Sequence, residues 1–436
     1  NGNKDENVFD IQQGVSIHIF IKEKRGSSAP AKVNYIDLFG TQQHKLDVLN
    51  KSSLHSLQWE KIEPKAPYYF FDNKDYSGTD VYEQGFSVAD LFLEKNTGIQ
   101  TKNDALTLQD SQSDIENLVR DFTTLSPKDL SVKYNIKSGG TWTAEAAKAD
   151  IMRGEYHIIP ILFRPFDVKY SVLTNKSSGF LGRPRYSTMI QMCFDFQNYA
   201  LLVGRQNKSD TIDSFLVTDL ASEMKCAERT IQSYHMPLFI AETDMIHNTI
   251  RPKANFATDI VKVIEQHLGL KMDWHQQRVS NGFTAVDVLD YIYAILYSED
   301  YRNQYKNQLK IDFPRIPYPK DANYFFSLVA LGRELRELHL MHNRLDEGNI
   351  AYVPGENSLV EVPKYKSGSI INNKTGARFI SVPVEIWNMG VGGYQPLQKW
   401  LKDRKGDFLS ANEIEHYIQM IAILIETKRI VSKIKI

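Results

Sequence analysis

The sequence predicts a mixed fold of the α/β class, in which mixed sheets with flanking helices follow an N-terminal β-hairpin. Short apolar runs rich in β-formers alternate with turn residues between positions 158 and 240. Two capping signals open helical apolar patterns further along, at Thr284 and Ser410. With 42% hydrophobic and 11% aromatic residues in 436 positions, the chain can bury several cores. These observations predict two or three domains of ordinary size.

The N-terminal hairpin is predicted from two β-rich runs joined by a turn. The first run is Gly14–Lys22, the turn is Gly26–Ala31, and the second run is Lys32–Leu38. Because a two-stranded hairpin is marginal in water, we expect it to complete a larger sheet. The first residues read as the interior of a longer chain, so the other strands are expected outside this sequence.

The remaining elements follow in order. Residues 51–95, rich in aromatic and turn residues, are predicted to be a connecting region, and helical patterns cover 114–122 and 143–153. Later helices are expected from Thr284, over Tyr324–His339 and from Ser410, where Asp287 and Glu413 complete the capping signals. Strands are predicted at Ile158–Phe163, Tyr199–Val203, Phe215–Val217 and Pro237–Ile240.

Charge and cysteine usage narrow the function classes. The net charge of −1 excludes a uniformly basic coat, although residues 361–436 carry twelve Lys/Arg against seven Asp/Glu. The polar, acidic start is unlike a secretory signal, and no apolar stretch is long enough to span a membrane. Cys193 and Cys226 lie far apart, which indicates a reduced, cytoplasmic protein with neither a disulfide framework nor a zinc site.

Several catalytic signatures are absent from the sequence. It contains no phosphate-binding loop, no dinucleotide-binding glycine motif, no His-Glu-x-x-His and no Gly-x-Ser-x-Gly. Gly390–Gly393 is interpreted as a tight turn, and His339 and His342 as histidines at a helix end. No Pro-Pro dipeptide occurs, so the Asn-Pro-Pro-Tyr site of amino-methyltransferases is absent. Asp37, Glu63 and Lys65 leave open a metal-dependent nuclease, on permissive spacing.

Four charged peptides are candidate functional segments. Arg164 and Asp167 flank a proline-fixed turn and are predicted to pair with each other, with direct DNA contact as the alternative. The other three peptides carry side chains that bind phosphates or read base edges, or that form an ordinary solvated surface. Their candidate DNA-binding residues are Arg183 and Arg185; Arg205, Gln206 and Lys208; and Lys399, Lys402, Arg404 and Lys405.

Six peptides, in this order along the chain, resemble the type ISP restriction–modification family of bacteria, whose members join nuclease, ATPase, adenine-N6 methyltransferase and target-recognition domains. The resemblance spans essentially the whole chain. Its peptides are Asn7–Ile17, Phe163–Asp167, Arg183–Tyr186, Leu289–Ser298, Asp312–Pro317 and Val391–Leu397.

The resemblance implies a division of labour. Residues 1–50 would be the C-terminal strands of the methyltransferase domain, 51–95 a connection, and 96–436 a target-recognition domain that divides near 255–285. It implies sequence-specific binding of double-stranded DNA and contact with the other domains of the parent enzyme. This chain would hold neither a catalytic residue nor a cofactor, whereas the parent would use SAM, ATP and Mg²⁺. An autonomous nuclease and a scaffold that contacts only other domains remain the alternatives.

Overall fold

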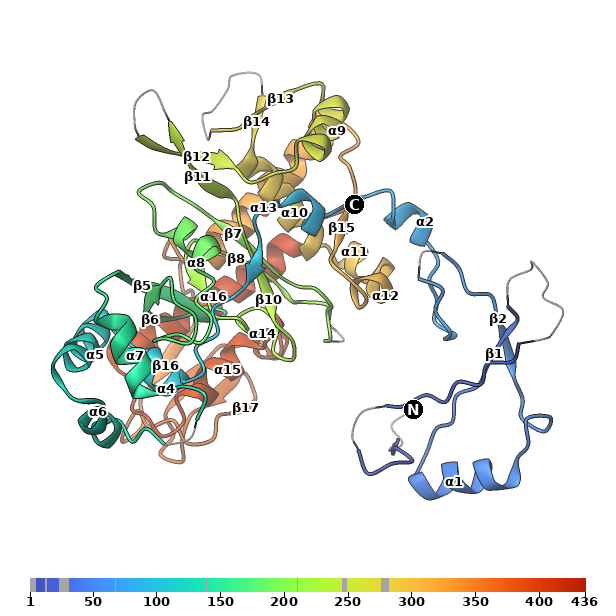
Figure 1. Ribbon diagram of the computed structural model, residues 1–436, viewed down its shortest axis with the longest axis horizontal. Helices are drawn as coiled ribbons and strands as arrows, with labels where there is room; N and C mark the ends of the chain where they lie inside the picture. The colour runs from blue at the N-terminus through green and yellow to red at the C-terminus, as the bar shows by residue number, and fades with distance from the viewer. Residues whose placement is uncertain are drawn as a thin grey trace. The chain divides into compact units, whose positions relative to one another are not determined.

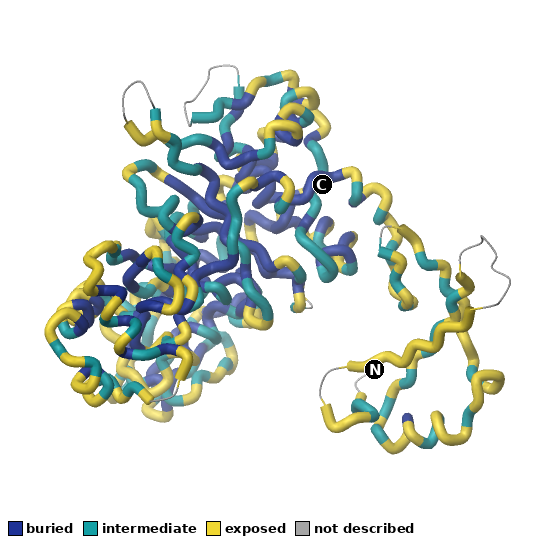
Figure 2. The backbone as a smooth tube through the Cα atoms, viewed as in Figure 1, coloured by how far each residue is buried: buried dark blue, intermediate teal, exposed yellow. Residues whose placement is uncertain are grey.

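The chain forms two compact units, Asn1–Tyr76 and Ser77–Ile436. The computed structural model describes residues 5–11, 14–22, 31–66, 68–137, 140–209, 211–244, 249–275 and 282–436. Buried segments gather in the larger unit, whereas the smaller unit is mostly exposed or half-buried (Figures 1 and 2). The regular elements of the smaller unit are β1 (Val33–Tyr35), α1 (Gln42–Lys51) and β2 (Glu60–Ile62).

The predicted N-terminal hairpin is wrong. Residues 14–22 contain no strand, and β1 pairs in antiparallel register with β2, so that Val33 lies opposite Ile62 and Tyr35 opposite Glu60. Residues 26–30 of the predicted turn lie outside the described residues. Residues 14–22 are exposed, and no second layer covers their apolar side chains, a condition under which short strand pairs are marginal. Apolar alternation alone therefore did not produce a strand.

A four-stranded antiparallel sheet lies at the centre of the larger unit. Strands β7 (Ala200–Gly204) and β8 (Phe215–Thr218) are buried along their whole length, with alternate residues entering different cores. Leu201 and Val203 pack in the core that contains α10, whereas Leu202 packs in the core that contains α16. The predicted strands Tyr199–Val203 and Phe215–Val217 are confirmed as β7 and β8, whereas the predicted strand Pro237–Ile240 spans the break between β10 (Ser233–Pro237) and β11 (Phe239–Asp244). The order of strands in the sheet is β4 (Asn96–Thr97), β10, β7 and β8.

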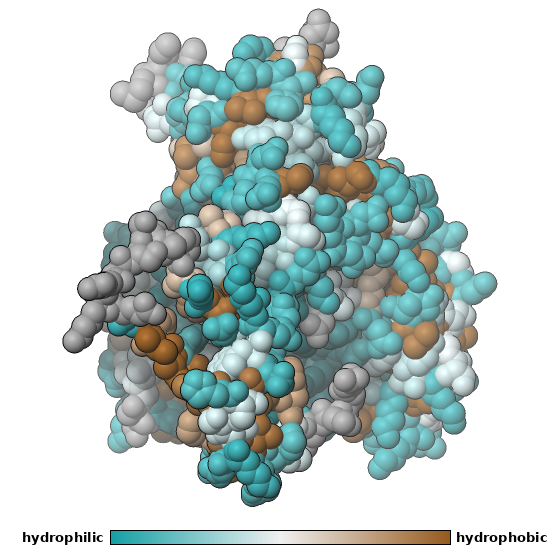
Figure 3. All heavy atoms as spheres, turned by 90° about the vertical axis from the view of Figure 1, so that its right-hand side faces the viewer, coloured by the Kyte–Doolittle hydropathy of each residue, from teal (hydrophilic) through white to brown (hydrophobic). Residues whose placement is uncertain are grey.

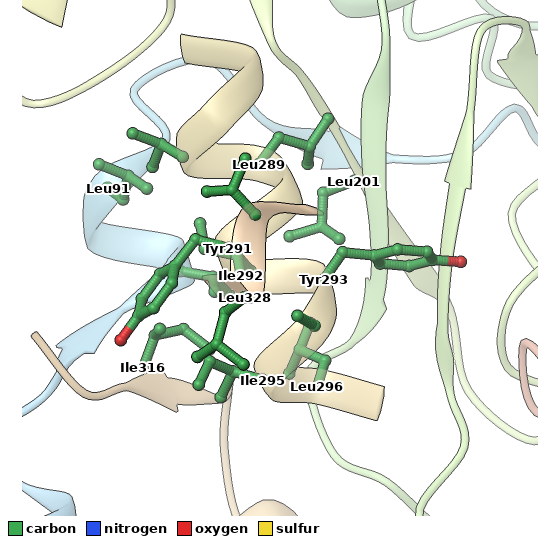
Figure 4. Packing of buried hydrophobic residues seen from close by; sticks show 14 of the residues in the cluster. Leu91, Leu201, Leu289, Tyr291, Ile292, Tyr293, Ile295, Leu296, Ile316 and Leu328 are labelled. Carbon is green, nitrogen blue, oxygen red and sulfur yellow. The ribbon is translucent and has the colours of Figure 1, made fainter. Parts of the chain in front are cut away.

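Helix α10 (Ala285–Tyr297) is the buried axis of the first core. It begins at the predicted capping box, in which the Thr284 and Asp287 side chains each accept the other's backbone N–H. Its side chains meet neighbours from β7 and α13 (Ala322–His339), among others (Figure 4). The helices pack so closely that a Cβ on Gly332 would stand 1.8 Å from the Asp290 carbonyl oxygen. Glycine is therefore required at that crossing.

A second body surrounds the long antiparallel hairpin of β5 (Tyr156–Arg164) and β6 (Asp167–Thr174), with β9 (Ala221–Ser222) parallel to β5. Four helices precede the hairpin in the chain and share its core, which includes Phe122, Ile161 and Phe180. The two predicted helical stretches fall within α5 and largely within α7. These helices are α4 (Asp104–Thr107), α5 (Gln112–Thr124), α6 (Pro127–Lys133) and α7 (Ala144–Ile151).

The C-terminal part packs against the far side of the central sheet. Helix α16 (Ala411–Val431) begins at the predicted Ser410–Glu413 capping box and contributes residues to both adjoining cores. The glycine run forms the predicted tight turn, since Gly392 and Gly393 have φ of 58° and 73°. The other elements are α14 (Val384–Trp387), α15 (Pro396–Asp403) and a sheet of β16 (Ala351–Val353), β19 (Arg378–Ile380), β18 (Ser369–Ile371) and β17 (Lys364–Lys366).

The remaining elements of the larger unit are short. On the face of the molecule that Figure 3 shows, hydrophobic residues reach the surface among polar ones. Among the described residues, no helix is long and apolar enough to cross a bilayer. The short elements are α2 (Thr79–Tyr82), β3 (Phe86–Ser87), α3 (Val88–Leu91), α8 (Tyr186–Met189), a 3₁₀ turn (Ile190–Met192), β11 (Phe239–Asp244), β12 (Thr249–Ala254), α9 (Thr258–Leu268), β13 (Lys271–Asp273), β14 (Gly282–Thr284), α11 (Glu299–Gln304), α12 (Lys306–Leu309) and β15 (Arg315–Ile316).

Candidate nucleic-acid interface

A polar cleft of about 380 Å³ lies between the segment that follows β4 and the loop between β6 and α8. Three of its lining residues are cations and none is a carboxylate. Two of the cations, Arg183 and Arg185, belong to the arginine peptide that the sequence singled out. The complete lining is Asn96, Lys102, Asn175, Ser177, Ser178, Gly182, Arg183, Pro184, Arg185 and Tyr186.

Backbone hydrogen bonds hold the two walls of the cleft together. Gln100 and Arg183 exchange both N–H···O bonds, at 3.0 and 2.9 Å, and Gly182 N–H donates to the Thr101 carbonyl oxygen at 3.3 Å. A Cβ on Gly182 would lie 2.6 Å from Lys102 Cγ, so glycine lets the lysine stem pass at this point. These bonds fix Lys102 on one wall of the cleft and Arg183 on the other.

Three of the lining residues other than glycine adopt left-handed backbone conformations. Their φ angles are 65° at Lys102, 57° at Ser178 and 53° at Arg185. Such conformations are uncommon outside glycine and gather at functional sites. Both walls of the cleft therefore carry backbone strain next to the cationic side chains.

The cations of the cleft form no salt bridge with any described residue. Arg183 and Lys102 are exposed, whereas Arg185 is half-buried and its Nε atom is enclosed without a described hydrogen-bond acceptor. Burial lowers the pKa of Arg185, and the neighbouring positive charge of Arg183 lowers it further. An anion in the cleft would relieve the repulsion between the two arginines.

The second predicted segment, after β7, is tied to the segment that follows α12. Arg205 is 58% exposed and forms a salt bridge with Asp312 at 2.8 Å, and Gln206 donates to the Ile311 carbonyl oxygen at 3.0 Å. Lys208 is exposed. Since Arg205 and Gln206 already have partners, Lys208 is the residue of this group best placed to bind an external anion.

The third predicted group divides into exposed lysines and one internal arginine. Lys402 and Lys405 are exposed, while Lys399 pairs with Asp403 one helical turn away, at 2.6 Å to Oδ2. Arg404 is only 14% exposed, and its guanidinium lies 3.7 Å from the centre of the Trp400 ring.

Arg404 also forms salt bridges with Asp167 at 2.9 Å and Glu413 at 3.0 Å. Its interpretation as a DNA contact is therefore replaced by a structural role, because its donors are used inside the fold.

The predicted Arg164–Asp167 salt bridge is not formed, although the two residues face each other in the β5–β6 register. Arg164 pairs instead with Glu223, at 2.5 Å, and Asp167 with Arg404. Side chains at the end of the hairpin reach partners distant in the sequence, which supply the buried countercharge that each group needs. The turn is thus held by tertiary ion pairs.

The nuclease alternative finds no support in the geometry of β1 and β2. Asp37 follows the end of β1 at which Tyr35 lies opposite Glu60, whereas Glu63 follows the other end, at which Ile62 lies opposite Val33. The two carboxylates therefore leave the strand pair at opposite ends. Within the described part of the chain, no group of three or more His, Cys, Asp or Glu side chains could hold a metal ion.

The two histidines at the end of α13 are placed in polar contacts. His339 is buried, with Nδ1 2.5 Å from Tyr293 Oη and Nε2 3.0 Å from Thr427 Oγ1. His342 Nε2 lies 2.7 Å from Asp219 Oδ2. Both lie beside a second cavity, of about 440 Å³, whose lining is mainly apolar. Their partners agree with the interpretation as helix-end histidines.

Sequence reasoning missed Lys102 and the polar residues Asn175, Ser177 and Ser178 of the cleft. Lys102 stands in a polar Thr-Lys-Asn-Asp segment, and the other three precede Gly179 in the loop between β6 and α8. Their local signal is that of ordinary loops. The bridge between Gln100 and Arg183 brings the two loops together, and no local pattern announces that bridge.

Comparisons with known proteins agree with the fold. The family described as "Type ISP C-terminal specificity domain" matches residues 90–433. The ATP-dependent Type ISP restriction–modification enzyme LlaBIII bound to DNA is similar in structure, with TM-score 0.67, 16% identity, and coverage of 93% of this chain and 28% of that one. No curated protein matches in sequence.

Two further solved structures are similar over 93% of this chain. A DrdV–DNA complex has TM-score 0.66, 18% identity and 43% of its chain covered. A nuclease-deletion mutant of the Type ISP enzyme LlaGI, in complex with a DNA substrate mimic, has TM-score 0.61, 20% identity and 33% covered. This chain thus spans less than half the length of each of these structures. Because the family match covers most of its residues, the chain belongs to the family of Type ISP C-terminal specificity domains.

Proposed function

We propose that this chain recognises specific sequences in double-stranded DNA as the specificity part of a restriction–modification enzyme. The observation that carries the proposal is the match of residues 90–433 to the Type ISP specificity domain. The carboxylate-free cleft adds physical support, since cations supply most of the affinity of a protein for a duplex. The exposed Lys208, Lys402 and Lys405 are further candidate contacts with phosphates.

We also propose that residues 1–50 close the methyltransferase domain of an adenine-N6-specific parent enzyme. In the smaller unit, a run of apolar side chains is left open to solvent: Ile17, Phe20 and Ile21 are 71%, 81% and 84% exposed. Contiguous exposed apolar residues mark contact surfaces, so this run supports packing against another domain of the parent chain.

The cofactors of the parent, SAM, ATP and Mg²⁺, would then bind outside these residues, and the adenine would be flipped into a pocket of that other domain. A cytoplasmic location is part of the same proposal, because the DNA substrate is there. The thiols fit a reducing compartment: burial raises the pKa of Cys193 to about 11 and that of Cys226 to about 12, which keeps both protonated and poorly reactive.

The test is duplex binding by the purified 436-residue protein across a salt series, combined with selection of bound duplexes from a randomised pool. We expect one preferred sequence, and an affinity that falls by a factor of about 10³ or more between about 50 and 200 mM salt. Equal binding to all sequences would remove target recognition. Absence of binding at low salt would remove DNA as the partner.

A further inference from the structure

The cleft between residues 96–102 and 175–186 differs from other arginine sites of the larger unit. Arg164, Arg336 and Arg404 each form a salt bridge with a carboxylate that is at most 7% exposed. Arg183 and Arg185 form none with any described residue, although they stand close enough for the charge of one to lower the pKa of the other. Within the described part of the chain, these two like charges therefore lie close together without a carboxylate to pair with them.

We propose that this cleft seats a single phosphate group of the DNA backbone between Lys102, Arg183 and Arg185. The inference rests on the proposed function, because a duplex is the source of the phosphate. A backbone phosphodiester presents two unesterified oxygens with one negative charge. Guanidinium groups match such oxygens through paired N–H donors, and an ammonium adds a further point charge.

The donor arrangement fits an anion and not a base edge. The lining contains three cations and no carboxylate, so a phosphate oxygen would supply the negative charge that the lining lacks. Base edges are read by side chains that project into a groove, whereas these cations line a recess. The exposed Ser177 and Ser178 at its rim offer neutral hydroxyl donors to the same oxygens.

The backbone of the cleft is organised before any ligand arrives. The reciprocal bonds between Gln100 and Arg183 fix the distance between the walls, and Lys102 and Arg185 hold left-handed conformations on opposite sides. A rigid seat loses little conformational freedom when it binds. Its role is then to set the position of the duplex on the protein, since phosphate contacts carry no sequence information.

The experiment compares the full chain with three variants, Arg183→Gln, Lys102→Gln and Lys262→Gln. Lys262 is an exposed lysine on α9, outside the cleft, and serves as the control for loss of one surface charge. Affinity for two duplexes of equal length and unrelated sequence is measured between about 50 and 200 mM salt. Circular dichroism and thermal unfolding verify that each variant is folded.

Log affinity falls as log salt rises, and we expect this negative slope to become shallower by about 0.9 in each cleft variant, equally for both duplexes. The Lys262→Gln variant should leave the slope unchanged. The ratio of wild-type to variant affinity then falls by about 3.5-fold over that salt range. A slope unchanged in both cleft variants, while the wild type still binds, would overturn the phosphate seat and leave DNA recognition intact.

A loss confined to one duplex would overturn the seat as well, because it would make these residues base-reading. If the wild-type chain itself shows no salt-dependent duplex binding, the seat and the proposed function fall together. The Arg185→Lys variant adds a check on geometry: we expect weaker binding with the slope retained, because the charge remains while the fork of donors is lost.

Discussion

The helix pair α10–α13 and the polar cleft use arginine in opposite ways. In the helix pair, Arg336 is buried beside Asp290, with Nε 2.7 Å from Oδ1, and its guanidinium lies 4.6 Å from the centre of the Tyr199 ring. In the cleft, Arg183 and Arg185 have no carboxylate partner among the described residues. Paired arginines stabilise the fold, whereas the unpaired arginines of the cleft are the ones we propose to bind a phosphate.

The largest expected effect comes from breaking the buried pair. Burial raises the pKa of Asp290 to about 6, although Arg336 and then Arg333 act to lower it, so the carboxylate is charged at neutral pH. In Arg336→Leu the buried carboxyl group loses its main partner, and its pKa rises further. We expect the free energy of unfolding to fall by about 3–5 kcal/mol, measured by urea denaturation.

The matched control is Arg333→Leu, which removes a neighbouring arginine that is 46% exposed, is bonded to Asp287 at 3.1 Å and approaches Asp290 only to 3.7 Å. It should cost about 1 kcal/mol or less. Equal losses in both variants would contradict the distinction between a paired, buried arginine and a surface one.

A second, smaller effect concerns pH in the same buried region. Burial lowers the pKa of His339 to about 3, and Arg302 adds to the shift, whereas an unfolded histidine titrates near 6.5. The stability that its neutral form contributes is therefore complete above about pH 6.5 and is lost as pH falls towards 3. Within that pH range, His339 lowers the free energy of unfolding by about 1.4 kcal/mol for each unit by which the pH falls.

Denaturation of His339→Gln between pH 7 and 4.5 should give a shallower fall in stability than the wild type, by that slope. Asp290 acts in the opposite sense, because its raised folded pKa adds stability at low pH that is lost as pH rises through about 6. Because the wild type and His339→Gln both contain Asp290, its contribution cancels in the difference between their unfolding free energies. Identical pH profiles would show that His339 has the same pKa in the folded and unfolded states, which would contradict the lowered pKa.

The smallest effect is expected in the cleft. Arg183→Gln removes an exposed charge that repels Arg185, so thermal unfolding at low salt should show stability unchanged or raised by at most about 0.5 kcal/mol. A loss above about 1 kcal/mol would mean that Arg183 holds the fold as Arg336 does, and the contrast between the two regions would disappear.

The parts of this fold that could be predicted are those encoded locally. Both capping boxes join residues three apart, and the β7 and β8 runs carry enough apolar residues to be recognised within a few positions. Contacts across long separations could not be predicted. Arg164 and Glu223 are 59 positions apart, and Arg404 and Asp167 are 237 apart.

The same limit applies to the candidate site. Arg183 and Arg185 could be identified because proline and tyrosine accompany them in one peptide. Lys102 could not, since its proximity to them depends on the bridge between Gln100 and Arg183. The prediction of a hairpin over residues 14–38 was wrong for a related reason. Alternation indicates which face of a strand is buried but not which strand it pairs with, and β1 pairs with β2.

The salt bridge between Asp167 and Arg404 has a consequence for engineering new specificities. It joins the β5–β6 turn to the segment just before the last helix, and that helix enters the cores on either side of the central sheet. In a chimera joined between residues 167 and 404, Asp167 would come from one parent and the surface around it from the other, so its buried carboxylate could lack a partner. Grafting should transfer Ser77–Ile436 as one block, with the splice at the boundary after Tyr76.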